Sequence, residues 1–160
     1  MRSLASIGFA LLALVACDAQ KIVKLEPGEA TEADVRKEWG TPAATYEETG
    51  GNTVLEYPRQ PEGQVNYAIT IGADGKLVKV SQVLKESNFV KVVNGMGPEE
   101  VRRILGKPAK MQKFELKNEE VWDWRYDDNG EAKVFSATFD ADRKVSATAR
   151  GVDAKRTTAP

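Results

Sequence analysis

The sequence predicts an α+β protein built from two tandem copies of a helix–helix–antiparallel-sheet unit, with the helices covering one face of each sheet. Three observations predict this fold: internal similarity, matching helix start and stop signals, and alternating apolar residues after each helix. Segment Thr31–Pro42 resembles Gly97–Pro108 at an offset of 66, and the offset drifts by only two residues further on. Such self-similarity indicates repeated structural units. We expect a first unit over residues 17–84, a second over 85–150 and a disordered tail over 151–160.

Each copy contains a helix with signals at both ends. In the first copy, Thr31 suits the N-cap and Asp34 follows three residues later, as in a capping box. In the second copy, Pro98 suits the first helical position. Gly40 and Gly106 stand where a left-handed C-cap is preferred, each with a proline two residues beyond. These signals predict one short helix per copy, ending at the two glycines.

A further helix is expected over residues 87–93, although its β-branched content makes a strand the competing interpretation. Alternation predicts strands after each main helix, with inward apolar positions Tyr67, Ile69 and Ile71 in the first copy and Phe135, Ala137 and Phe139 in the second. Asp74-Gly75 predicts a tight hairpin turn. Arg143 replaces the turn glycine in the second copy, so we expect another or a longer turn there. Another strand is expected near residues 110–116.

Composition excludes several classes of function. The chain has 160 residues, a net charge of −1, no histidine and a single cysteine. No basic stripe recommends nucleic acid as a partner. Without histidine and with a single cysteine, zinc and copper sites built from these residues are ruled out, and so are Ser-His and Cys-His nucleophiles. We therefore expect no cofactor, no metal and no enzymatic activity.

The N-terminus has the order of a secretory signal peptide: basic Arg2, an apolar stretch from Leu4 to Ala16, then small residues before a cysteine. The stretch is too short to span a bilayer, which takes roughly 20 residues. Leu14-Val15-Ala16-Cys17 resembles the lipobox of bacterial lipoproteins. The resemblance implies removal of residues 1–16 and attachment of fatty acids such as palmitate at Cys17. The competing interpretation is an ordinary signal peptide that leaves a free thiol.

Two further motifs carry a family resemblance. Residues 94–101 with Leu105-Gly106-Lys107-Pro108, followed by the aromatic strand 121–126, resemble the SmpA/OmlA (BamE-type) lipoprotein family. The first copy keeps Trp39-Gly40-Thr41-Pro42 but has Ala30 where methionine is usual. Tandem units of this kind also occur in the β-lactamase inhibitor protein fold. A family member usually has one unit, whereas this chain has two.

The resemblance implies a non-enzymatic, membrane-anchored accessory in outer-membrane β-barrel assembly, which binds the barrel-assembly machinery or other envelope proteins. The folded part would face the periplasm from the outer membrane, although Asp18 after the acylated cysteine leaves the inner membrane open. The alternative hypothesis is a periplasmic inhibitor or sensor that binds an envelope enzyme between its two sheets. An enzyme is the third hypothesis.

A possible partner surface comes from an aromatic stripe and two basic helix positions. The aromatic residues share one strand face and are interpreted either as a recognition stripe or as core under the helices. The basic pair is interpreted either as an anion- or partner-binding site or as a solvated helix face. The candidate residues are Trp122, Trp124, Tyr126, Arg102 and Arg103.

Two acidic pairs are candidates for chemical sites. Asp140 and Asp142 suggest calcium, but the remaining loop ligands are missing, so a turn is the preferred interpretation. Glu119 and Glu120 are adjacent in a predicted strand and would point to opposite faces, which argues against an acid–base pair.

Overall fold

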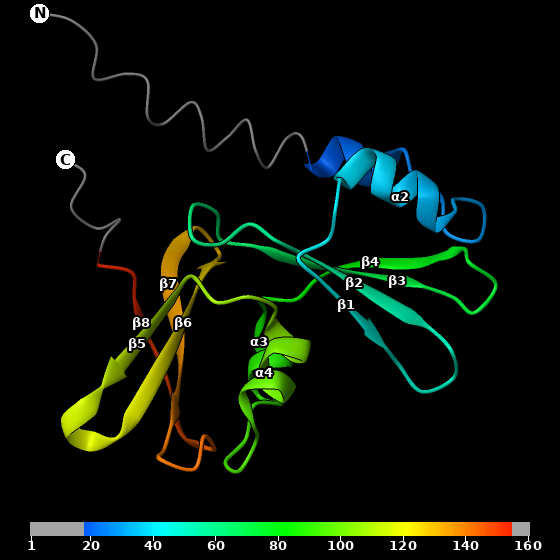
Figure 1. The fold of residues 1–160 in the computed structure, drawn as a ribbon. Coiled ribbons are helices and arrows are strands. Elements are labelled where there is room, and N and C mark those ends of the chain that lie inside the picture. The colour runs from blue at the N-terminus through cyan, green and yellow to red at the C-terminus, as the bar shows by residue number, and fades with distance from the viewer. Residues whose placement is uncertain (1–17, 155–160) are drawn as a thin grey trace, which may run out of the picture. The chain divides into compact units, whose positions relative to one another are not determined.

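The computed structural model describes residues 18–154, so the predicted signal peptide, Cys17 and the last six residues lie outside the described part. Residues 18–23 are helical. The elements that follow are α2 (Glu32–Trp39), β1 (Ala44–Glu47), β2 (Thr53–Pro58), β3 (Asn66–Ile71), β4 (Leu77–Gln82), α3 (Glu86–Phe89), α4 (Pro98–Leu105), β5 (Lys110–Phe114), the 3₁₀ turn η1 (Glu115–Lys117), β6 (Glu119–Asp128), β7 (Glu131–Phe139) and β8 (Val145–Val152) (Figure 1).

The protein is α+β, as predicted, with two antiparallel four-stranded sheets and few helices. Their strand orders are β1-β2-β3-β4 and β5-β6-β7-β8, so each sheet is a simple meander. The chain divides into two compact units: the first runs up to Tyr57 and resumes over Ala68–Ser81, and the second contains Pro58–Tyr67 and everything from Gln82 onward. The sequence-based boundary at 84/85 had assigned residues 58–67 to the first unit. Their contacts place them in the second.

The first unit buries one face of its sheet under α2. The predicted capping box is present: the Thr31 backbone N–H donates to Asp34 Oδ2 at 2.9 Å, and the Asp34 N–H donates to Thr31 Oγ1 at 3.3 Å. Val35 is fully buried and the Trp39 ring packs at 5.4 Å from the Tyr57 ring. The inward positions expected on β3 are buried as well. Here the alternating pattern and the helix caps both predicted the core correctly.

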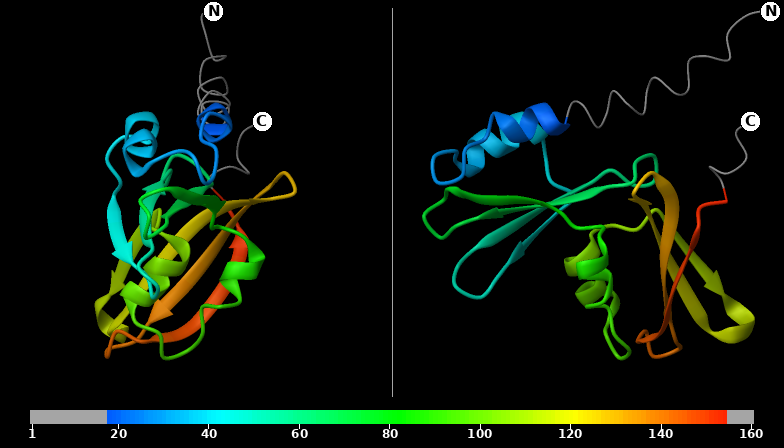
Figure 2. Two further views of the ribbon diagram at one scale, coloured as in Figure 1. Left: turned by 90° about the vertical axis from the view of Figure 1, so that its right-hand side faces the viewer. Right: turned by 180° about the vertical axis from the view of Figure 1, so that it is seen from behind.

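In the second unit, α3 and α4 lie beside the sheet (Figure 2). Aromatic side chains fill the core between the sheet and α3. Phe89 of α3 stacks on Phe135 of β7 at 4.5 Å and meets Tyr126 edge-on at 4.7 Å. Trp124 is fully buried, and Trp122 and Tyr126 are 7% and 6% exposed. Trp122, Trp124 and Tyr126 are therefore core residues and not the exposed recognition stripe that the sequence also allowed.

The helices α2 and α4 have the same kind of C-terminal cap. Gly40 and Gly106 have positive φ angles of 82° and 74°, a backbone conformation that glycine adopts without a Cβ clash. The Gly40 carbonyl accepts a hydrogen bond from the Tyr57 hydroxyl at 2.9 Å. The Gly106 carbonyl accepts one from Trp124 Nε1 at 2.8 Å. In each unit an aromatic residue of the second strand thus satisfies a helix-end carbonyl while its ring fills the core.

Equivalent backbone hydrogen bonds also occur within each of the two units. The Gly28 N–H donates to the Leu77 carbonyl at 2.8 Å, and the Gly95 N–H donates to the Val145 carbonyl at 2.8 Å. The first strand pairs Ala44 with Glu56, and its counterpart pairs Lys110 with Asp123. These equivalent positions are separated by 66 to 68 residues, which is the offset of the sequence similarity.

The β7–β8 turn differs from expectation. Arg143 was expected to force another or a longer turn, but Arg143 adopts the left-handed conformation with φ 57°, as Gly75 does with φ 77°. The Asp140 N–H donates to the Lys144 carbonyl at 2.9 Å, matching the 2.7 Å bond from Gly72 to Lys76. Two backbone N–H groups that donate to the Asp140 carboxylate stabilise the turn, so its length is kept without glycine.

Two element boundaries also differ from expectation. The helix expected over 87–93 is the short α3, Glu86–Phe89, followed by turns. Residues 151 and 152, which were expected in a disordered tail, belong to β8, and Asp153 is 4% exposed. Asp153 is held by the Arg125 side chain of β6, described below, and by the Ala132 carbonyl of β7, which accepts the Asp153 N–H at 2.9 Å. No local sequence pattern predicts these contacts.

Candidate functional site

The sequence-predicted site residues are not gathered in one place. Cys17 lies outside the described residues, and the three aromatic residues are buried. Arg102 and Arg103 lie on α4, where the first is half-buried and the second is exposed. Each takes part in further intramolecular interactions. Neither arginine therefore forms a site together with the aromatic side chains at the surface.

The acidic candidates are explained by local structure. Asp140 accepts backbone hydrogen bonds from Asp142 and Lys144 at 3.0 and 2.9 Å, which is the role of a turn residue. Glu120 accepts a hydrogen bond from the indole N–H of Trp122 at 2.9 Å. Within residues 18–154, no group of three or more potential metal-binding side chains comes together.

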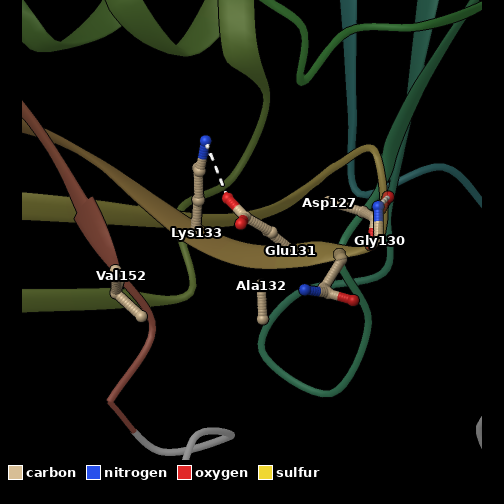
Figure 3. A pocket seen from close by; sticks show the side chains of 7 residues that line it. Asp127, Gly130, Glu131, Ala132, Lys133 and Val152 are labelled. Carbon is tan, nitrogen blue, oxygen red and sulfur yellow. Dashed lines mark hydrogen bonds and ion pairs between the residues drawn. The ribbon is translucent and has the colours of Figure 1, made fainter.

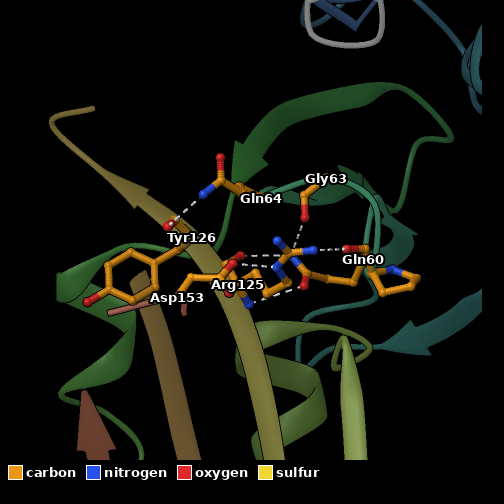
Figure 4. A network of polar contacts seen from close by, with 7 residues as sticks. Gln60, Gly63, Gln64, Arg125, Tyr126 and Asp153 are labelled. Atoms are coloured by element: carbon orange, nitrogen blue, oxygen red, sulfur yellow. Dashed lines mark hydrogen bonds and ion pairs between the residues drawn. The ribbon is translucent and has the colours of Figure 1, made fainter. Parts of the chain in front are cut away.

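A polar network in the second unit joins segment 58–67 to β6 (Figure 4). The Gln60 side chain donates from Nε2 to the Arg125 carbonyl at 2.8 Å, and the Arg125 N–H donates to Gln60 Oε1 at 3.1 Å. The Gln60 amide thus makes the two hydrogen bonds to β6 that the backbone of a neighbouring strand would make. Arg125 Nε donates to Asp153 Oδ2 at 2.6 Å, and its Nη1 donates to the Pro61 carbonyl at 2.9 Å. Gln64 donates to the next carbonyl along β6 at 3.2 Å.

This network is structural. Arg125 and Asp153 form an ion pair whose side chains are 19% and 5% exposed. A buried charge is tolerated when it is paired and hydrogen-bonded, and here the guanidinium connects three segments of the unit. The network therefore joins these segments of the second unit and helps to fix its fold.

A depression of about 460 Å³ lies beside the network, at the β6–β7 turn and the end of β8 (Figure 3). Gln64, Ala132 and Val152 line it together with the charged residues of the turn. Lys133 pairs with Asp128 and with Glu131, the latter at 3.3 Å. The hydrogen bonds from the ammonium to these carboxylates raise the pKa of Lys133 above its usual value. The lysine is thus a protonated, paired cation and is unsuited to act as a nucleophile or base.

Three exposed apolar residues of the second unit lie at the edge strand β5 and in η1. Met111 is 56% exposed, Phe114 39% and Leu116 fully exposed. We call these three residues the β5 edge patch. In the described sheet, β5 has β6 as its single neighbour, so its outer edge is open. A second depression, of about 230 Å³, adjoins the patch and is lined by Phe114 and by Asp140 and Arg143 of the β7–β8 turn.

The β5 edge patch has the properties of a protein-binding surface. An open strand edge offers unpaired N–H and C=O groups to an incoming strand, and exposed apolar side chains mark interaction sites. Lys110 and Lys113 on the same strand are the kind of charged residues that blunt self-association of an edge. The strand is predictable from the sequence but its exposed surface is not. Whether both faces of the strand are exposed depends on how far the sheet extends beyond its helices.

No family model matches the chain, and no curated protein matches it. Among solved structures, a putative osmotically inducible lipoprotein, OsmE, aligns at 28% identity and a TM-score of 0.39, over 44% of this chain and 82% of that protein. A DUF4309 family protein, YjgB from Bacillus subtilis, aligns at 16% identity and a TM-score of 0.29, over 81% of this chain and 82% of that protein. Superpositions at these TM-scores do not define a family.

Proposed function

We propose that this protein is a lipoprotein of the bacterial envelope that binds protein partners and performs no chemistry, as an accessory in outer-membrane β-barrel assembly. The observation that carries the proposal is the lipobox at residues 14–17, which stands directly before the folded chain. The family resemblance of the second half supplies the assembly role. Across residues 18–154, no helix is long and apolar enough to cross a membrane.

We further infer that the two units arose by duplication. The support is the set of recurring bonds: a glycine carbonyl capped by Tyr57 or Trp124, and the same strand-to-loop pairs at an offset of 66 to 68 residues. Only the second unit combines the aromatic β6 strand with the β5 edge patch. We therefore assign partner binding to the second unit.

Partner binding is tested by pull-down of the tagged, membrane-anchored protein from the intact envelope. We expect recovery of barrel-assembly components, and fractionation of the same cells should place the protein in the outer membrane. Recovery of none of these components, with normal outer-membrane protein levels in a deletion strain, would contradict the assembly role.

The partner surface is tested with charge substitutions at exposed apolar positions. Met111→Glu and Leu116→Glu should abolish recovery of the partner without changing the melting temperature, because both side chains are largely in solvent. Val152→Glu is the matched control, since Val152 is 69% exposed on the opposite edge strand, β8. Equal loss of partner in all three variants would reject the β5 edge patch as the binding surface.

A periplasmic inhibitor or sensor that holds an enzyme against its sheets would be favoured by an exposed aromatic face. The aromatic face of β6 is buried, so no observation favours this alternative.

A further inference from the structure

The fold begins within one residue of the proposed acylation site. Asp18, which follows Cys17, is 3% exposed, and residues 18–23 are already helical. Neighbouring Cα atoms across a trans peptide are about 3.8 Å apart. If Cys17 carries the lipid, the chain offers no linker between the membrane attachment and the first unit.

The anchor-proximal helix, residues 18–23, is attached to α2 along one side. Asp18 and Leu25 are buried and Ile22 is half-buried, at the i, i+4 and i+7 spacing of one helix face. The Lys21 ammonium lies 5.7 Å from the centre of the Trp39 ring. Just beyond the end of this helix, the Lys24 ammonium pairs with Glu38 of α2 at 3.3 Å.

The opposite side of this helix is exposed and partly apolar. Ala19, Gln20, Val23 and Lys24 line a shallow surface depression of about 360 Å³. Their spacing, i, i+1, i+4 and i+5, places them on a single helix face. Val23 is 81% exposed. We call these four residues the anchor-proximal face.

We propose that the anchor-proximal face lies against the bilayer that holds Cys17, so that the first unit is seated directly on the membrane surface. The proposal rests on the proposed function, because it requires acylation of Cys17. Six helical residues extend over only about 9 Å, and each polar interfacial layer of a bilayer is roughly 5–7 Å thick. A helix that starts at the attachment point and presents Ala19 and Val23 on its outer side can bury these side chains by lying in the plane of the interface.

The bilayer is favoured over a protein as the occupant because of chain length. One residue separates the face from the lipid, so the membrane is present at this face whenever the protein is anchored. A partner protein would have to enter between the first unit and the bilayer.

The test uses single-cysteine variants, which the sequence makes simple. Cys17 is the only cysteine, and acylation removes its thiol. Val23→Cys and the control Val78→Cys are labelled with an environment-sensitive fluorophore in the full-length acylated protein. Val78 is 48% exposed on β4 of the same unit, and the alternation of strand side chains places it on the sheet face opposite buried Leu77. The proteins are reconstituted into vesicles of phosphatidylethanolamine and phosphatidylglycerol.

We expect aqueous iodide to quench the label at position 23 several-fold less than the label at position 78. A spin-labelled lipid should quench the label at position 23 alone. Equal iodide quenching at both positions, in protein that carries its fatty acids and sediments with the vesicles, overturns the proposal while leaving the anchor intact. Protection from iodide without quenching by the lipid also overturns it, since the occupant would then be protein. A mass spectrum without fatty acid on Cys17 refutes the anchoring itself.

Discussion

Replacing Asn66 should destabilise the second unit by more than any single surface change. The Asn66 side chain is fully buried, and its Nδ2 donates to the carbonyls of Leu105 at 2.8 Å and Lys107 at 3.0 Å. Its Oδ1 accepts the Arg59 N–H at 3.1 Å. One amide thus satisfies two carbonyls at the C-terminal end of α4, where helices leave such groups without intrahelical partners.

The magnitude follows from which partners lose their hydrogen bond. The Arg59 N–H keeps a second acceptor, the Val65 carbonyl at 3.1 Å. The Leu105 carbonyl is buried, and a buried unpaired polar group costs about 1–3 kcal/mol. Lys107 is exposed, so we assign its carbonyl only the net value of an ordinary hydrogen bond, about 0.5–1.5 kcal/mol. Asn66→Ala should therefore reduce the free energy of unfolding by about 1.5–4.5 kcal/mol.

Urea unfolding followed by tryptophan fluorescence measures this change, because Trp122 and Trp124 report on the second unit. Asn66→Asp should be at least as destabilising at pH 7, since a carboxylate would face two carbonyl oxygens and have no proton to donate. Asn94→Ala, at an exposed asparagine, is the control and should change stability by less than about 0.5 kcal/mol. If Asn66→Ala and Asn94→Ala unfold at the same urea concentration, the helix-end carbonyls do not depend on this amide.

Three further outcomes are expected. Gly106→Ala should cost about 2–4 kcal/mol, because φ is +74° and a Cβ would lie 2.9 Å from the capping amide; thermal unfolding measures the loss, and a melting temperature equal to wild type would count against it. The hydrogen bond from Thr31 lowers the pKa of Asp34 below 3.8, so its stabilising contribution is present above pH 3.8 and is lost as the pH falls through the folded pKa; melts from pH 2 to 6 should show a smaller pH dependence in Asp34→Asn. The hydrogen bond to Asp128 raises the pKa of Lys133 above 10.5, so its contribution is complete below pH 10.5 and is lost as the pH rises through the folded pKa; Lys133→Met should unfold with less alkaline sensitivity, and an unchanged profile would mean the pairing is not stabilising.

Local signals predicted the helices, because helix ends are determined by nearby residues. Thr31 and Asp34 form the expected capping box, and Gly40 and Gly106 end their helices with positive φ. Strand faces were predicted equally well where apolar and polar residues alternate. The Arg143 turn was missed because a side-chain preference was given more weight than the backbone hydrogen bonds that Asp140 supplies.

The polar interior of the second unit could not be predicted from the sequence. Gln60 and Arg125 are 65 positions apart, and Asn66 caps a helix 39 positions later. Asn66 also stands in an alternating strand, where the pattern indicated a half-buried polar face. Hydrogen bonds of this kind depend on which distant segments the fold brings together. The periodicity of apolar residues in the sequence does not predict them. The same is true of the exposed apolar side chains at the β5 edge.

The membership of residues 58–67 in the second unit limits how this protein can be dissected. An expression fragment that starts at residue 85 would lack Gln60 and Asn66, leaving Arg125 and the end of α4 without these partners. Measurements on such a fragment would describe an incomplete second unit and not the native one. Binding studies on the later half should therefore use the entire mature chain, or supply the missing decapeptide in trans and ask whether it restores the fold.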